Sequence, residues 1–148
     1  MPFTHLLWKC LLPGKTGVQE GGKGARLRPE AEECVLVFRV DHPDFRMVFG
    51  LQGRPVCDTL FFSKKLGEEP VLWLVEFKGS DVSRAVEQIE STLQLLKHKL
   101  AQHRAEYRAV VVTNRGVPTQ QKGRIREFER KHKMALKVSR DGDLRTLL

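Results

Sequence analysis

The spacing of apolar positions separates an N-terminal stretch without periodicity from a core of short strands and helices. Apolar runs separated by turn-forming residues predict antiparallel strands over Cys34–Val40, Phe45–Gly50, Val56–Phe62 and Val71–Lys78. After Gly79 the apolar residues recur at steps of three and four, which predicts a helix from Ser80 or Asp81 to about His103.

The C-terminal third continues this alternation of strands and helices. Arg108–Thr113 is a short β-branched run that follows a helix, so we expect it to join the sheet in parallel. Pro118 begins a second predicted helix that runs to about His132, and Met134–Ser139 predicts a last strand. The order of elements predicts an α/β fold with a mixed sheet flanked by helices.

Residues 1–33 precede this core of residues 34–140 in what we interpret as a single domain of residues 1–148. Met1–Leu12 is apolar and predicts a strand or short helix, whereas the glycine- and cation-rich Lys15–Arg28 predicts a mobile loop. Pro29–Glu33 is typical of a single helical turn. Gly14–Thr16 suggests a phosphate-binding loop, but Lys9 occupies the position where that motif requires glycine.

Composition narrows the class of protein. Hydrophobic residues make up 41% of the 148 residues and charged residues 30%, which is typical of a globular chain, and the net charge of +8 suits a polyanionic partner. The three cysteines form neither a zinc motif nor a disulfide framework, so we expect a reducing, cytoplasmic location. The sequence shows neither a signal peptide nor a membrane-spanning stretch, so we expect no membrane association.

Candidate chemistry lies at the ends of two neighbouring predicted strands. Strand alternation places Glu76 and Lys78 on one face, and an antiparallel pairing with the preceding strand brings Asp58 beside them. An acid and a base at the edge of a core reduce the stability of the fold unless they form an ion pair or take part in chemistry. Two carboxylates suit Mg²⁺, and the lysine is suited to orienting or deprotonating a water molecule or to holding a phosphate.

This arrangement resembles the PD-(D/E)xK nuclease superfamily, which includes restriction endonucleases and Holliday junction resolvases. The resemblance rests on Asp58, on Glu76-Phe77-Lys78 and on Gln88 in the following helix, and it covers roughly residues 34–113. It implies a restriction-endonuclease-like core of helix, three antiparallel strands, helix and strand. Cys57 precedes Asp58 where the family's motif has proline.

The resemblance also implies roles for individual residues in a Mg²⁺- or Mn²⁺-dependent endonuclease. Asp58, Glu76, Lys78 and Gln88 would be catalytic. Asp58, Glu76 and the main-chain carbonyl of Phe77 would bind the metal. Some members carry a further metal-binding acid on the first core helix. The candidates for that acid are Glu20, Glu30, Glu32 and Glu33, and the sequence does not distinguish them.

The excess positive charge is concentrated near the C-terminus. Nine Lys or Arg and only two Glu lie between Arg115 and Arg140. This segment is interpreted either as a solvated helix face or as a surface that contacts nucleic-acid phosphates. The candidate contacts are Arg115, Lys122, Arg124, Arg126, Arg130 and Lys131.

Three functions follow from these observations. The first is a metal-dependent nuclease acting on nucleic acid, with DNA as the expected substrate and a homodimer as a way to cut both strands. The second is a catalytically inactive nucleic-acid-binding module of the same fold. The third is an interaction protein in which Glu76 and Lys78 form only an ion pair.

Overall fold

A five-stranded sheet forms the centre of the protein. The structure, a computed structural model, describes residues 10–20, 22–79 and 81–147. The strand order in the sheet follows the chain: β3 (Glu33–Arg39), β4 (Thr59–Lys65), β5 (Val71–Phe77), β6 (Glu106–Val112) and β7 (Leu136–Ser139). Strands β3, β4 and β5 are antiparallel, and β6 and β7 run parallel to β5. The predicted mixed sheet with a parallel strand after the long helix is therefore confirmed.

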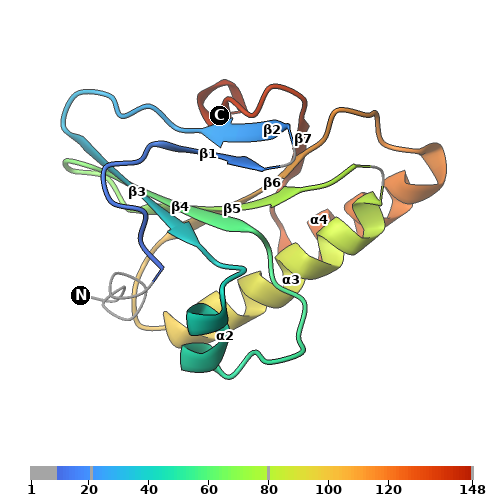
Figure 1. The fold of residues 1–148 in the computed structure, drawn as a ribbon, viewed down its shortest axis with the longest axis horizontal. Helices are drawn as coiled ribbons and strands as arrows, with labels where there is room; N and C mark the ends of the chain where they lie inside the picture. Colours follow the sequence, from blue (N-terminus) through green and yellow to red (C-terminus); the bar gives the residue numbers. More distant parts are fainter. Residues whose placement is uncertain (1–9, 21, 80, 148) are drawn as a thin grey trace.

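The two faces of the sheet are covered by different layers (Figure 1). The three α-helices of the described residues, α2 (Pro43–Phe49), α3 (Val82–Lys99) and α4 (Lys122–His132), lie on one face. The other face packs against a two-stranded hairpin, β1 (Gly17–Glu20) and β2 (Lys23–Arg26), and against the short 3₁₀ helix η2 (Leu144–Leu147). Strand β5 is consequently buried on both sides, which explains its continuous apolar run.

Helix α3 positions the chain after β5. Asp81 is its N-cap, and the side chain accepts a hydrogen bond from Arg84 N at 3.0 Å. The helix buries Val82, Ala85, Val86, Ile89, Leu93 and Leu96 against the sheet, in agreement with the predicted periodicity. It ends at Lys99, four residues before the expected boundary. The second predicted helix is divided into the 3₁₀ helix η1 (Thr119–Gln121) and α4.

The predicted strand at Phe45–Gly50 is wrong, because this segment belongs to α2. Pro43 lies in the first turn, and the His42 side chain caps the helix by accepting a hydrogen bond from Asp44 N at 3.1 Å. The rings of Phe45 and Phe49, one turn apart, lie 4.6 Å apart between centroids. Gly50 ends the helix in a left-handed conformation, with φ +66°. This arrangement of proline, phenylalanines and glycine favours a helix over an extended strand.

The predicted mobile loop at Lys15–Arg28 is also wrong, because it contains the β1–β2 hairpin. Val18 pairs with Ala25, and Gly22 in the connection has φ +76°, a conformation that suits a two-residue hairpin turn. Ala25 is buried against the sheet, so the hairpin belongs to the second core. The prediction for Met1–Leu12 falls mostly outside the described residues, although Leu11 forms an antiparallel bridge with Phe38 of β3.

A segment near the C-terminus, residues 141–143, holds the outer edge of the hairpin. Arg26 N donates to the Gly142 carbonyl at 2.9 Å, and the Arg26 guanidinium contacts Asp143 at 3.4 Å. A Cβ atom at Gly142 would lie 1.6 Å from the Gly24 carbonyl oxygen, and φ at this glycine is +71°. Only glycine allows the two backbones to approach this closely.

The first helix expected from the resemblance is absent from Pro29–Glu33. These residues form a turn in which Glu33 N donates to the Glu30 carbonyl at 3.2 Å, before β3 begins.

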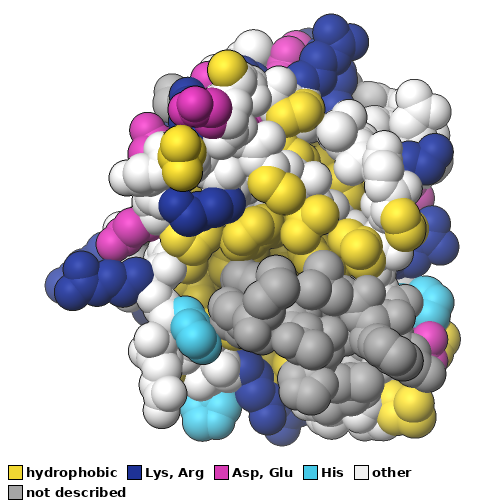
Figure 2. Space-filling view, turned by 90° about the vertical axis from the view of Figure 1, so that its left-hand side faces the viewer, with side chains coloured by type: hydrophobic (Ala, Val, Ile, Leu, Met, Phe, Trp, Pro, Cys, Tyr) yellow, Lys and Arg dark blue, Asp and Glu magenta, His cyan; other side chains and the backbone are white. Residues whose placement is uncertain are grey.

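In the described part of the chain, no helix is both long enough and apolar enough to cross a bilayer. Figure 2 shows hydrophobic side chains gathered at one end of the molecule, beside the residues that the structure does not describe.

Candidate active site

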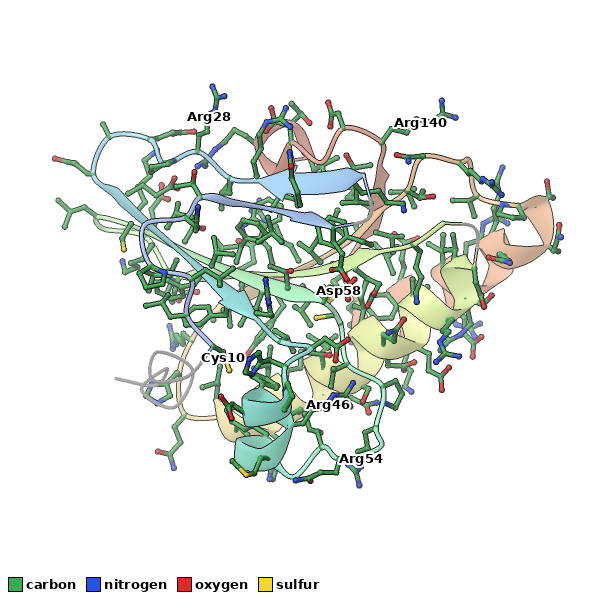
Figure 3. All side chains as sticks on the ribbon, in the orientation of Figure 1. Cys10, Arg28, Arg46, Arg54, Asp58 and Arg140 are labelled. Atoms are coloured by element: carbon green, nitrogen blue, oxygen red, sulfur yellow. The ribbon has the colours of Figure 1, made fainter. Side chains whose placement is uncertain are left out.

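Asp58 joins the ends of three strands. It immediately precedes β4, and its carbonyl oxygen accepts hydrogen bonds from Val40 N at 3.0 Å and Asp41 N at 3.4 Å, just after β3. Its Oδ2 accepts a hydrogen bond from Phe77 N, the last residue of β5, at 2.9 Å. The predicted neighbourhood of Asp58 and Glu76-Phe77-Lys78 is present, and in Figure 3 Asp58 lies near the middle of the molecule, between the sheet and the helices.

Glu76 is the most unusual side chain at this end of the sheet. It is 1% exposed, and its Oε2 has no hydrogen-bond partner among the described residues. Burial, followed by the hydrogen bond and the charge of the neighbouring Asp58, raises the pKa of Glu76 to about 10, against a smaller opposing effect of Lys78. Without a cation at this position, the raised pKa keeps Glu76 protonated at neutral pH.

Lys78 follows β5 directly and is held by its backbone, because its N–H donates to the Val112 carbonyl at 3.0 Å. The side chain is partly exposed, and its charge lowers the pKa of Glu76, so its ammonium lies within electrostatic reach of the buried carboxyl. Within the described residues, Lys78 forms no ion pair at a distance of 4.0 Å or less. A direct Glu76–Lys78 ion pair, the basis of the interaction-protein hypothesis, is therefore not formed.

Two α3 side chains fix the segment that leads to Asp58. Gln88 Nε2 donates to the Val56 carbonyl at 3.2 Å, and Thr92 Oγ1 accepts a hydrogen bond from Cys57 N at 2.9 Å. Gln88 is thus a positioning residue here, although its Oε1 is buried without a hydrogen-bond partner among the described residues. Thr92 was not predicted, but a fully buried polar residue on the apolar face of a helix is a signal that identifies it.

Further acids gather on the solvent side of Asp58. Glu20, Asp41 and Asp58 line a recess of about 250 Å³ together with Val18, Gln19, Arg39 and Thr59. Burial and then the charges of Asp58 and Asp41 raise the pKa of Glu20. Asp41 was not among the site residues predicted from the sequence. It is also paired with Arg46 at 3.0 Å.

The four candidates for a further acid are separated by this geometry. Glu20 alone among them lines the recess at Asp58. Glu30 and Glu33 bind Arg145, and Glu30 also binds Lys65 at 2.8 Å, at the end of β4 away from Asp58. Glu32 lies at that same end, because its carbonyl accepts a hydrogen bond from Leu66 N.

The oxygen atoms around Asp58 and Glu76 meet some of the requirements for binding a hard divalent cation. No group of three or more His, Cys, Asp or Glu side chains among the described residues is spaced to hold a metal ion. Two carboxyl groups nevertheless meet in hydrogen-bond contact, and one of them carries a buried oxygen that has no partner in the described part of the chain. The Phe77 main chain is held against Asp58 beside them. Mg²⁺ is commonly held by one or two protein carboxylates and retains several waters, so this pair suits such an ion.

The predicted basic residues divide into two groups. Arg124 and Lys131 bind Glu90 of α3 at 2.8 and 2.7 Å, and His132 Nε2 lies 2.9 Å from the same carboxyl. These two cations therefore join α4 to α3. The other four are exposed and have no side-chain ion pair among the described residues. They are Arg115, Lys122, Arg126 and Arg130.

Replacing Glu90 with Gln should lower the free energy of unfolding at pH 7 by about 1–2 kcal/mol, because three partners lose a charged acceptor. Burial alone would raise the pKa of Glu90, but hydrogen bonds from Lys131, Arg124 and His132 outweigh it and lower that pKa to about 2. The contribution of Glu90 to stability is therefore present above its usual pKa of 4.5 and is lost as the pH falls toward 2.

The measurement is urea unfolding of Glu90→Gln and of the exposed neighbour Glu87→Gln at pH 7 and pH 3. Glu87→Gln should unfold like the wild type at both values. The deficit of Glu90→Gln should shrink at pH 3. An equal deficit at both values would show that Glu90 acts through packing instead of charge.

Comparison of the chain with models of known protein families, with curated proteins and with solved structures finds no match. Any assignment of function therefore depends on the residues and geometry described above.

Proposed function

We propose that the protein is a metal-dependent nuclease that hydrolyses phosphodiester bonds, with a core of the restriction-endonuclease-like type. The observation that carries the proposal is the buried Glu76 carboxyl, which lies against Asp58, two residues before Lys78 at a strand end, with one oxygen lacking a partner among the described residues. A buried acid in this state is costly to the fold. A divalent cation would remove that cost, because it would satisfy the unpartnered Glu76 oxygen and favour the charged form of Glu76.

The chain's own residues have distinct tasks in this proposal. Asp58, Glu76 and the carbonyl of Phe77 would hold Mg²⁺ or Mn²⁺. The bound ion would neutralise charge on the phosphate and lower the pKa of a water molecule. The Lys78 ammonium would stabilise charge that develops on the phosphate or orient the attacking water. Gln88 would act indirectly, by holding the Val56 carbonyl so that Asp58 keeps its position.

A catalytically inactive nucleic-acid-binding module remains the second candidate. It is supported by the lack of a three-residue metal group among the described residues, together with the net charge of +8. In that case Glu76 would remain protonated and the exposed cations alone would bind phosphates.

The two candidates are separated by cleavage of dye-labelled single-stranded, duplex, nicked and branched DNA and of RNA, each with Mg²⁺, Mn²⁺ or chelator. The nuclease should cleave at least one of these only with metal. Asp58→Asn should slow that cleavage by about 10²-fold or more, because one metal-binding charge is lost while an oxygen remains to accept from Phe77 N.

Glu68→Gln is the matched control, since Glu68 is an exposed acid in the loop between β4 and β5. It should cleave at the wild-type rate. Binding of nucleic acid without cleavage under every condition would favour the inactive module.

A further inference from the structure

A positively charged groove continues from the acidic recess along the hairpin. This groove of about 600 Å³ is lined by Lys15, Arg26 and Arg39, by no acid of the described residues, and otherwise by uncharged residues of the hairpin and of the chain just before it. It shares Val18, Gln19 and Arg39 with the recess that contains Asp58. The two hollows are therefore adjoining, one acidic and one basic.

Arg39 lies at the boundary between them. It is the last residue of β3, pairs in register with Thr59 and therefore lies next to Asp58 along the sheet. Its charge lowers the pKa of Glu20, so the guanidinium is within electrostatic reach of the acidic recess. In the described part of the chain, its side chain forms no hydrogen bond or ion pair and is exposed. A free guanidinium beside an acidic recess is well placed to bind a phosphate.

Lys15 provides a second free cation farther along the groove. Its side chain is exposed and has no hydrogen-bond or ion-pair partner among the described residues. Arg26, by contrast, is engaged by Asp143 and by the Asp141 carbonyl. The groove therefore offers two uncommitted cations, Arg39 near the acids and Lys15 beyond it.

We propose that this groove binds a single nucleic-acid strand, with phosphates next to the scissile one held by Arg39 and Lys15. The proposal rests on the nuclease function and adds the class of substrate and its path. Hollows of about 600 and 250 Å³ have the size of small-molecule pockets, which suits one or two nucleotides of a single strand. A duplex presents phosphates on two strands, whereas the described residues of this groove bring two uncommitted cations along one path, so we expect the duplex to bind more weakly.

The test is fluorescence anisotropy with a dye-labelled ten-nucleotide oligothymidylate and a blunt duplex, in chelator and over a range of salt concentrations. Chelator makes the result independent of catalysis and of metal binding. The double variant Lys15→Gln/Arg39→Gln should bind the single strand about 5–30-fold more weakly at low salt. Its plot of log affinity against log salt should be flatter by about 1.4, since each phosphate contact contributes about 0.7.

The matched control is Lys99→Gln/Arg104→Gln, which removes two exposed cations at and just after the end of α3, outside the predicted phosphate contacts, and should leave single-strand affinity unchanged. Arg39→Lys should retain most of the affinity, and a thermal melt of each variant verifies folding. Wild-type affinity and slope in the Lys15/Arg39 double variant would overturn the proposal. So would an equal loss of affinity in the control variant, or equal binding of duplex by the wild type. Metal-dependent cleavage with any of these results would leave the nuclease function standing while the groove assignment fails.

Discussion

Lys78→Ala is expected to slow single-turnover cleavage by about 10²–10⁴-fold, the usual cost of losing a positioned acid–base or electrostatic group. Nucleic-acid affinity should stay nearly unchanged, because many other cations contribute to it. The melting temperature should also change little, since Lys78 forms no ion pair within the described residues. A large change in rate without a change in affinity or stability identifies a residue that acts in the transition state.

Two further variants sharpen this measurement. Lys78→Arg should recover little activity, because the planar guanidinium is bulkier and does not release its proton. Lys99→Ala removes an exposed lysine from the last turn of α3 and should cleave like the wild type. Cleavage by Lys78→Ala at the wild-type rate would end the catalytic assignment of this lysine. A large fall in its melting temperature would instead assign it a structural role.

Glu76→Gln should abolish cleavage and at the same time stabilise the metal-free protein at alkaline pH. Glutamine keeps the size and neutral state of the protonated acid but cannot become charged. In the folded wild type the pKa of Glu76 is raised to about 10 from 4.5. The folded state therefore binds more protons than the unfolded state between these values, and stability falls as the pH rises.

The expected loss for the wild type is up to about 1.4 kcal/mol per pH unit, or roughly 3–5 °C in melting temperature, between pH 6 and pH 9. Glu76→Gln should lack this slope. Mn²⁺ should raise the melting temperature of the wild type, most strongly at high pH, where protons compete least for the carboxyl groups. It should leave Glu76→Gln unaffected.

These melting curves distinguish a binding site from a buried acid without a ligand. A wild type whose stability is constant from pH 5 to pH 9 would contradict the protonated state of Glu76. An equal shift of both proteins by Mn²⁺ would place the ion elsewhere. Either result is independent of whether the correct nucleic-acid substrate has been found.

The sequence predicted correctly those segments whose pattern of apolar residues favours a single type of secondary structure. The run Val71–Val75 is apolar enough to require burial on both faces, and the spacing after Val82 fits only a helix. The segments that were predicted wrongly carried competing signals. Phe45–Gly50 is short enough for its aromatic residues to suit a strand, and only the proline before it and the glycine at its end indicate a helix. The glycines of residues 17–24 indicate flexibility and a hairpin turn equally well.

The candidate site was predictable only where its residues are close along two strands. Asp58, Glu76 and Lys78 follow from pairing and alternation. Asp41 and Glu20 reach the same recess from a chain reversal and from the hairpin, and their positions depend on tertiary packing that has no local pattern. The same limit applies to Arg124 and Lys131, because the charge excess of their segment did not show that Glu90 binds both.

The contact between residues 141–143 and the hairpin also has a consequence for the order of assembly. The sheet adds each strand beside the previous one along the chain, so most of its pairing can form progressively as residues are synthesised. The bridge between Arg26 and Asp143 instead joins residues from opposite ends of the described sequence. The contact that holds the hairpin beside the groove is therefore the last to form. A newly made chain would have its sheet before its groove, so full strand binding should mature later than the bulk secondary structure during refolding.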